Sequence, residues 1–252
     1  MKRTLLLILV WTVCLQAYAG PAIASKNWFT PAGNGGFSAV ARSVCREPDT
    51  EPPPDIWSPN HMRKITTRPS PEGDTIVLAV DENGHEFPID TYGWPCPEIG
   101  WSPSSALFFV TYSDGGAVGT YHVAAYRFSE GNLTRMDPTP AVRRDFRRRY
   151  PKCFAPEEPN IAGIAWSADS TKILVAAEVL PHSNCDDMGT FALYAVAVPS
   201  GRITGRISQI AAKATLHEAL GPELRAADDR CLLSPGSCRI PALHRPRKGK
   251  ST

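Results

Sequence analysis

The polar run at 182–187, HSNCDD, brings together an imidazole, a thiol and two carboxylates. A zinc site needs nitrogen, sulfur and oxygen ligands in such a cluster. The candidate ligands are His182, Cys185, Asp186 and Asp187. The other five histidines are scattered along the chain, and we expect Cys185 to form a disulfide bond instead. The sequence therefore predicts a polar loop between two strands here, with no metal and no cofactor.

Other patterns that could support catalysis are incomplete. A nucleophile elbow requires G-x-S-x-G, and the run GFSA at 36–39 lacks the last glycine. The run GNGG at 33–36 lacks the lysine of a phosphate-binding loop. The acidic pairs at 157–158, 186–187 and 228–229 are adjacent in sequence, so on an extended chain their side chains point to opposite sides. We therefore predict no catalytic residue.

Positive charge is concentrated in one stretch of ten residues. Its cations are Arg143, Arg144, Arg147, Arg148, Arg149 and Lys152. Thr139 and Pro140 are typical of the first positions of a helix, Phe146 and Tyr150 lie four residues apart on one face, and Pro151 ends the run. We expect a basic helical insert within 137–160.

This basic stretch has two interpretations. Arginine forms two parallel hydrogen bonds with a carboxylate or a phosphate, so the six cations with Tyr150 predict a surface that binds an acidic partner. The alternative is a solvated helix face that is neutralised by nearby acids. Those acids are Asp145, Glu157 and Glu158.

The elements that would position these residues show an internal repeat. Three segments align without gaps: SPEGDTIVLA at 70–79, SPSSALFFVT at 102–111 and SADSTKILVA at 167–176. Trp101 and Trp166 precede the second and third segments, and Pro69 takes that place in the first. Serine and acidic residues favour a tight turn, and the short apolar run after them favours a buried strand.

The residues that come after each segment also share a pattern. The ranges 121–136 and 191–206 both contain a strand, a turn with serine and glycine, and a second strand. In the first copy, Asn83-Gly84 is a strong signal for a hairpin between two short strands. Each unit is therefore predicted to be a meander of three or four antiparallel strands.

These serine turns resemble the WD40-like repeat of TolB-type β-propellers, in which a W-S-P-D-G turn precedes a buried strand. The resemblance covers about 66–206 through WSPSS, WSADS and PSPEG. It implies a stack of small sheets, each of which needs neighbours to bury its faces. Closed propellers have about four to eight blades, whereas three are counted here, and the prolines in 27–60 disfavour a fourth. The expected fold is all-β and propeller-like, with three or four sheet units and an incomplete ring.

The N-terminus has the features of a secretory signal. Lys2 and Arg3 precede an apolar core at 5–15, and Ala17-Tyr18-Ala19 predicts cleavage after Ala19. No later apolar run approaches the roughly 20 residues of a transmembrane helix. We expect a periplasmic or secreted protein without a transmembrane segment.

Six cysteines come after the predicted signal: Cys45, Cys96, Cys153, Cys185, Cys231 and Cys238. An even number of cysteines in an exported chain predicts disulfide bonds. Proximity favours a bond between Cys231 and Cys238, and the sequence leaves the remaining pairing open.

The C-terminal part departs from the strand pattern. Residues 207–231 are rich in alanine and leucine, with a capping-box spacing at Thr215 and Glu218 and a stop at Gly221-Pro222. The predicted organisation is a signal peptide (1–19), a lead-in rich in proline and glycine (20–60), β-repeats (61–206), and a helical closing segment with a basic tail (207–252).

Without the signal, the chain has 25 basic and 25 acidic residues. Such a neutral balance does not support nucleic-acid binding. We predict a non-catalytic exported binding protein that engages a protein or anionic partner in the cell envelope, in the manner of an inhibitor or immunity protein. One alternative is a periplasmic hydrolase or lyase with a site at the propeller mouth. Another is a purely structural repeat domain. The sequence does not indicate an oligomeric state.

Overall fold

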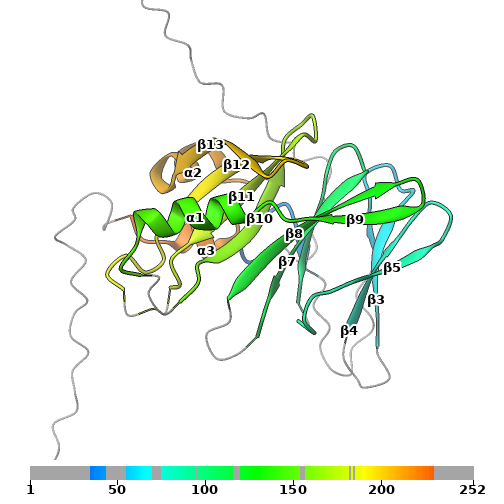
Figure 1. The fold of residues 1–252 in the computed structure, drawn as a ribbon, viewed down its shortest axis with the longest axis horizontal. Helices are drawn as coiled ribbons and strands as arrows, with labels where there is room; N and C mark the ends of the chain where they lie inside the picture. The colour runs from blue at the N-terminus through cyan, green and yellow to red at the C-terminus, as the bar shows by residue number, and fades with distance from the viewer. Residues whose placement is uncertain are drawn as a thin grey trace, which may run out of the picture.

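A computed structural model gives the fold, and most of the described residues with regular structure lie in strands (Figure 1). The structure describes residues 35–43, 55–69, 75–94, 96–115, 120–153, 157–181, 183 and 185–229. Within these ranges the chain forms three antiparallel sheets and three short helices. The predicted cleavage site and the basic tail lie outside the described residues.

Each sheet is built from strands that succeed one another along the chain, with one exception. The first sheet contains β2 (Ile56–Trp57), β3 (Lys64–Pro69), β4 (Thr75–Val80) and β5 (Glu86–Ile89). The second contains β6 (Glu98–Trp101), β7 (Leu107–Ser113), β8 (Tyr121–Ser129) and β9 (Asn132–Met136), with β1 (Arg42–Ser43) added beside β6. The third contains β10 (Asn160–Trp166), β11 (Lys172–Glu178), β12 (Phe191–Ala197) and β13 (Arg202–Ser208). The prediction of successive antiparallel meanders is confirmed.

Apolar side chains join the sheets in chain order. One core cluster lies between the first and second sheets and includes Ile65 and Phe108. A second cluster joins the second sheet to the third and includes Phe109 and Trp166. The strands in these clusters are rich in β-branched and aromatic residues, which pack well on a pleated surface. Each sheet therefore depends on its neighbour to bury one face.

The ring of Phe109 fixes how closely the second and third sheets approach. It lies between two glycines, Gly100 on β6 and Gly163 on β10. A Cβ atom at either position would come within 2.3 Å and 2.5 Å, respectively, of that ring. Both positions therefore require a residue without a side chain.

In each sheet, a Trp-Ser turn follows the strand that carries the tryptophan. The first copy of this turn lies at a different place in the sequence from the one predicted. Backbone N–H groups of Ser58, Ser102 and Ser167 donate to the carbonyl five residues later, over 2.8–2.9 Å. Three residues after each serine, the backbone adopts a positive φ; these residues are His61, Ser105 and Ser170. The first copy is therefore WSPN at 57–60, and the alignment of 70–79 with the other two segments was wrong.

The physical reason for this error is the context of the first turn. Prolines lie just before Trp57, and prolines disfavour paired strands. For this reason the sequence did not predict the two-residue strand β2, which pairs with β3. In place of the Trp-Ser turn, the alignment matched Ser70 and the apolar run of β4. That strand is third in its sheet, whereas β7 and β11 are second in theirs, counted from the strand that carries the tryptophan. The range 20–60, assigned to a lead-in, contains both β1 and β2.

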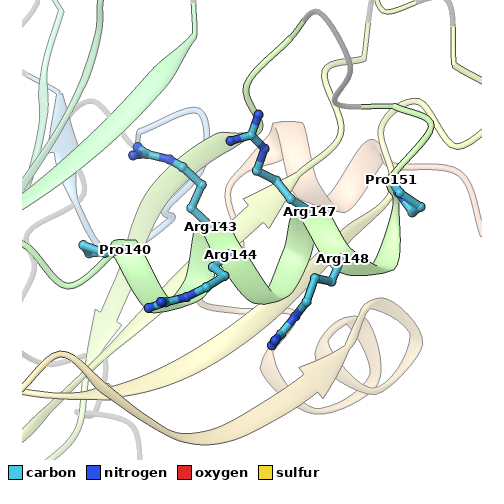
Figure 2. A pocket seen from close by; sticks show the side chains of 6 residues that line it. All are labelled: Pro140, Arg143, Arg144, Arg147, Arg148 and Pro151. Atoms are coloured by element: carbon cyan, nitrogen blue, oxygen red, sulfur yellow. The ribbon is translucent and has the colours of Figure 1, made fainter.

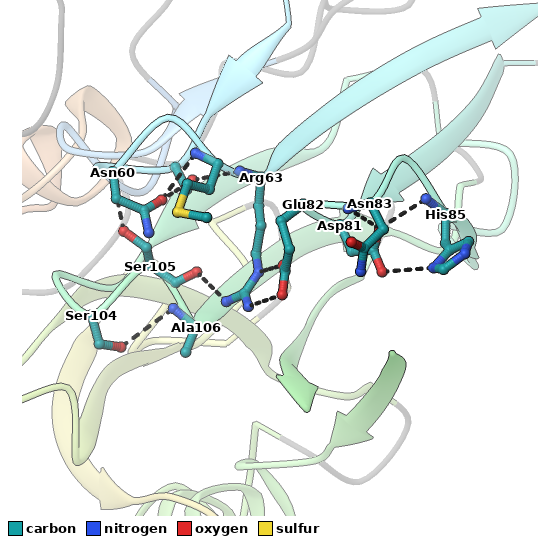
Figure 3. Close-up of polar contacts among 11 residues, drawn as sticks. Asn60, Arg63, Asp81, Glu82, Asn83, His85, Ser104, Ser105 and Ala106 are labelled. Atoms are coloured by element: carbon teal, nitrogen blue, oxygen red, sulfur yellow. Dashed lines mark hydrogen bonds and ion pairs between the residues drawn. The ribbon is translucent and has the colours of Figure 1, made fainter. Parts of the chain in front are cut away.

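The turns are linked to one another by a hydrogen bond that recurs. The N–H of Asn60 donates to Ser105 Oγ over 3.1 Å (Figure 3), and the N–H of Ser104 donates to Ser170 Oγ over 3.0 Å. Arg63 adds a link, since its guanidinium donates to the carbonyl of Ser105 and pairs with Glu82 over 2.6 Å (Figure 3). The three turns thus form a continuous row along one side of the stack.

The tryptophans provide a second recurring link. Trp166 Nε1 donates to the carbonyl of Gly100 over 2.9 Å, and Trp101 Nε1 donates to the carbonyl of Ile56 over 3.1 Å. In each case the indole joins the tryptophan-bearing strand of one sheet to the corresponding strand of the sheet before it. A buried indole N–H needs such an acceptor, so this bond sets the position of each sheet against the last.

The predicted hairpin at Asn83-Gly84 is present between β4 and β5. Asp81 Oδ1 accepts the N–H groups of Asn83 and His85, both over 2.8 Å (Figure 3). Gly84 has a φ of 84°, a conformation that glycine adopts without steric cost.

A strap at residues 35–43 ties the second sheet to the C-terminal part. The N–H of Ala39 donates to the carbonyl of Ala219, and the N–H of Gly221 donates to the carbonyl of Phe37 over 2.7 Å. The strap and two short helices cover the outer face of the third sheet. These helices are α2 (Gln209–Leu216) and α3 (Pro222–Ala226).

The C-terminal helices begin at residues other than those expected. Ser208 caps α2 by accepting the N–H of Ala211, whereas Thr215 lies inside the helix and donates to the carbonyl of Ala211. Pro222 starts α3 as its first residue, after Gly221. The capping-box assignment was wrong because a threonine hydroxyl inside a helix can donate to a backbone carbonyl one turn earlier. A threonine therefore does not by itself mark the start of a helix.

One disulfide is described in full: Cys153 and Cys185 are bonded, with their Cα atoms 5.3 Å apart. Cys96 is also disulfide-bonded. Cys45, Cys231 and Cys238 lie outside the described residues, and so does the bond expected between the last two. In the described ranges, every helix is too short or too polar to cross a bilayer.

Candidate functional site

The basic insert forms the helix α1 (Pro140–Arg149), which lies between the second and third sheets in the chain and packs on the third. Proline occupies one of its first positions, as predicted, and three arginines occupy its last turn. Cations at a helix C-terminus interact favourably with the helix dipole. The inward side chains Val142 and Phe146 are fully buried in the core cluster between the sheets.

The outward face of α1 carries a stripe of arginines (Figure 2). Arg143, Arg144, Arg147 and Arg148, with Pro140 and Pro151 at the ends, line an open hollow of about 650 Å³. Spacings of three and four residues place side chains on one face of a helix. The sequence therefore dictates this stripe once the buried pair, Val142 and Phe146, fixes the rotation of the helix.

Nearby acids neutralise part of this charge. Glu158 lies 3.2 Å from a nitrogen of Arg147 and 3.7 Å from one of Arg143. Asp145 lies 3.1 Å from Arg148 and 3.0 Å from Arg149. Asp145 and Glu158 thus pair with the helix face in the way that the alternative interpretation of the sequence expects.

Asp145 is the more firmly held of the two acids. The hydroxyl of Tyr194 donates to its carboxylate over 3.1 Å. Burial opposes ionisation of this carboxyl, but hydrogen bonds from Arg149, Tyr194 and Arg148 outweigh burial and hold its pKa below the usual range. The hydrogen bond with Asp145 correspondingly raises the pKa of Arg149. Asp145 therefore stays ionised and fixes the C-terminal turn of the helix.

The stripe nevertheless keeps an excess of positive charge. Four arginines share two carboxylates, and the described part of the chain provides no ion pair for Arg144 or Lys152, which are both exposed. Exposed ion pairs contribute little stability, about 0–1 kcal/mol each. The arginines can therefore exchange these partners for others at small cost.

The structure separates the predicted binding residues into groups. Arg143, Arg144, Arg147 and Arg148 all line the hollow. Figure 2 shows Arg143 and Arg147 pointing to one side of α1 and Arg144 and Arg148 to the other. Arg149 lies beside Asp145, and Lys152 is exposed beyond the end of the helix. Tyr150 packs its ring on Phe146, with ring centres 4.8 Å apart, and contributes to the core. Tyr150 is therefore a packing residue.

The described residues of the run HSNCDD, 183 and 185–187, lie in the loop between β11 and β12, as expected. Cys185 is bonded to Cys153, and the two sulfurs lie within 4.8 Å of a carboxylate oxygen of Asp187. Because both sulfurs are in a disulfide, they offer no thiolate to a metal. The bond anchors the segment after α1 to this loop. His182 lies outside the described residues.

Two buried carboxyls gave no signal in the sequence. Glu98 accepts the N–H groups of Phe37 and Ser38 over 3.1 Å and 3.2 Å, and burial raises its pKa against these bonds. Glu178 accepts a bond from Asn160 over 2.9 Å. Burial raises the pKa of Glu178 to about 8, although the bond from Asn160 opposes this rise.

These two carboxyls have structural partners. Glu98 holds the strap against β6, and Glu178 holds the start of β10, whose Asn160 also accepts the N–H of Tyr121. A raised carboxyl pKa marks many catalytic acids, but structural networks raise it as well. Neither residue lines the arginine hollow. Sequence patterns cannot reveal them because their burial depends on distant segments.

No protein-family model, no curated protein and no solved structure matches this chain.

Proposed function

We propose that this protein is a non-catalytic binding protein that is exported to the periplasm or secreted, and that its α1 arginine stripe engages an acidic partner. We further propose that its three sheets are successive blades of a propeller-like scaffold, as the resemblance to TolB-type repeats implies. In this proposal the scaffold holds the stripe rigid, and the partner is a protein of the cell envelope. An inhibitor or immunity protein would act in this way.

The observation that carries the proposal is the form of the arginine stripe. Of the four guanidinium groups on this helix face, those of Arg143 and Arg147 share Glu158, that of Arg148 pairs with Asp145, and that of Arg144 makes no ion pair with the described residues. The helix itself is fixed by a buried phenylalanine on one side and by a disulfide just beyond its end. A rigid set of guanidinium groups binds carboxylates or phosphates with less loss of conformational entropy than flexible side chains do.

Binding to a partner should depend on this stripe. In a pull-down from envelope extract at low salt, the wild-type protein is expected to recover a stoichiometric acidic partner. The double variant Arg147→Glu and Arg148→Glu should lose most of that partner, because two contacts become repulsive. Rising salt should weaken binding, since the contacts are charged and exposed.

The matched control is the double variant Arg202→Glu and Arg206→Glu on β13, which changes the net charge equally at another surface. It should retain the partner. Recovery of no partner at low salt, or equal loss in both double variants, would contradict the proposal.

A further inference from the structure

A second cavity, of about 390 Å³, lies beside the start of α1, and Arg143 lines both this cavity and the arginine hollow. Its walls come from the loop after β5, from β7, β8 and β9, and from the first turns of α1. The lining residues include Tyr92, Tyr112, Asp114, His122, Arg135 and Asp137. Ligand cavities in proteins occupy about 300–1,000 Å³ and combine aromatic walls with a few polar groups. This cavity has both properties.

Aromatic rings form one wall. Tyr92 stacks on Tyr112 with ring centres 5.8 Å apart, and Tyr112 lies 5.9 Å from the ring of His122, its neighbour across β7 and β8. Tyr92 is 65% exposed, so one face of its ring is open to solvent. The rings therefore provide a platform for a flat apolar surface.

The backbone of Tyr92 supports a role beyond packing. Its φ is 51°, in the left-handed region that a bulky residue rarely adopts. Strain of this kind persists at ligand sites because the surrounding structure holds it. Here the N–H of Tyr92 donates to Asp90 Oδ1 over 2.9 Å, and this bond fixes the turn. The turn thus holds an exposed tyrosine at the rim of the cavity.

Charged groups of both signs face the same space. Arg135 donates one hydrogen bond to the hydroxyl of Tyr112 over 3.1 Å and makes no ion pair with the described residues. Asp114 and Asp137 each use one oxygen within their own loops, to bind the N–H groups of Thr120 and Thr139. Asp114 Oδ2 lies 3.5 Å from His122 Nε2. The guanidinium of Arg135, the second oxygen of Asp137 and the unused lone pairs of the Asp114 carboxylate remain to bind a ligand.

We propose that this cavity binds one sugar residue that carries a carboxylate, a hexuronic acid. Such a ligand has the three features that the walls require. The C–H face of its ring packs on Tyr92, its carboxylate pairs with Arg135, and its hydroxyl groups donate to the aspartates. A doubly charged phosphate ligand is disfavoured relative to a singly charged carboxylate because two carboxylates line the cavity. A purely apolar ligand would leave the charged groups unpaired, at a cost.

Nuclear magnetic resonance tests this directly, with sodium glucuronate, glucose and acetate as probes. Glucuronate should shift the ring resonances of His122 and Tyr92 saturably, with a Kd of about 1 mM, which is ordinary for a single small ligand. Glucose, which lacks the carboxylate, should bind at least about tenfold more weakly, and acetate, which lacks the ring, should give no saturable shift. If acetate binds as tightly as glucuronate, the cavity is an ordinary anion site. If glucose binds as tightly as glucuronate, Arg135 has no role in binding. Either result overturns the proposal, and so does the absence of a saturable shift with glucuronate.

Variants locate the site. Tyr92→Ala should weaken glucuronate binding about tenfold or more, while Tyr92→Phe, which keeps the ring, should retain it. Arg135→Gln should abolish the preference for glucuronate over glucose, and Arg202→Gln, on β13, should change nothing.

This proposal shares Arg143 with the arginine stripe, but Arg147 and Arg148 do not line the cavity. The double variant Arg147→Glu and Arg148→Glu should bind glucuronate as the wild type does, so either proposal can fail without the other. If Tyr92→Ala keeps full affinity while its spectrum shows an intact fold, the cavity is not the binding site.

Discussion

The tryptophan of the Trp-Ser turn is buried in the third sheet, at one end of the stack, and exposed in the first sheet, at the other end. At the third sheet, Trp166 is 2% exposed, and its indole is bonded to the second sheet; Trp101 is 3% exposed and is bonded to the first. Trp57 occupies the same place in the first sheet, yet it is 45% exposed, and no described acceptor meets its indole nitrogen. The difference arises because no sheet precedes the first one in the described chain.

The residue opposite each tryptophan shows how the sequence adapts to this difference. Phe108 pairs with Trp101, and Ile173 pairs with Trp166, but Lys64 pairs with Trp57. The ammonium of Lys64 lies 5.3 Å from the centre of the Trp57 ring and 2.7 Å from Asp55. The terminal sheet thus presents a polar face, as terminal repeats do in other stacked proteins.

The other end of the stack is covered by elements outside the repeat. The strap, α2 and α3 lie on the outer face of the third sheet, and α1 packs on the third sheet at β11 and β13. Figure 1 shows the helices gathered around the third sheet, with β3, β4 and β5 at the far side of the molecule. In the function that we propose, the sheets provide the scaffold and the inserted helix provides the binding surface.

The largest expected effect is the difference in stability between variants of Trp166 and Trp57. Trp166→Ala should reduce the free energy of unfolding by about 3–5 kcal/mol, because it removes a buried aromatic side chain. Trp57→Ala should cost less than about 1 kcal/mol, since the ring is half exposed and the indole bridges no sheets. Chemical denaturation of both variants measures the difference. Equal losses would show that the first turn is not a terminal copy of the others.

The disulfide near α1 should have the next largest effect. Replacing both Cys153 and Cys185 by alanine removes a cross-link between positions 32 residues apart. The chain-entropy relation gives a loss of about 3–4 kcal/mol. Hydrogen exchange should become faster in α1 and in the loop at 185–190, while β3 and β4 keep their local protection. Uniform acceleration through all three sheets would show that the bond does not act locally on the helix.

The smallest effect concerns a buried carboxyl of the third sheet. Burial raises the pKa of Glu178 to about 8 in the folded protein, against 4.5 for the unconstrained group. Between these two values the folded state binds more protons than the unfolded state, so stability is full below about pH 4.5 and falls as the pH rises towards 8. Glu178→Gln should remove this fall, which we expect to be about 2 kcal/mol between about pH 4.5 and pH 6.

The matched control is Glu86→Gln in the first sheet, where the carboxylate is exposed and paired with Arg68. It should leave the pH dependence of unfolding unchanged between about pH 5 and pH 8. A wild-type stability that rises with pH over this range would contradict the assignment to Glu178.

Much of the scaffold could be predicted from the sequence because its signals are local. The Trp-Ser turns, the runs of valine, isoleucine and phenylalanine, and the Asn83-Gly84 hairpin each depend on a few neighbouring residues. The helix at 140–149 was equally accessible, since Pro140 and the buried Phe146 define its start and its inner face.

The rest required long-range information. The first Trp-Ser turn was missed because its strand β2 has only two residues and comes after a run of prolines. The strap was missed because its backbone bonds go to residues 219–221, about 180 positions away. Tyr150, which the sequence assigns to the binding surface, is half-buried and packs its ring on Phe146, four residues before it. The cavity that we propose as a sugar site draws on the loop after β5, on β7, β8 and β9 and on the start of α1, and no local sequence pattern predicts it.

The most direct test of the central claim, that the α1 arginine stripe is the binding surface, is site-specific cross-linking in cells that make the protein. A photo-reactive amino acid would replace Arg144, which is exposed in the middle of the stripe, and, in a second variant, Arg202 on β13. The account predicts one discrete adduct at position 144, lost when Arg147 and Arg148 are changed to glutamate, and none at position 202. No adduct at 144, or the same adducts at both positions, would contradict it.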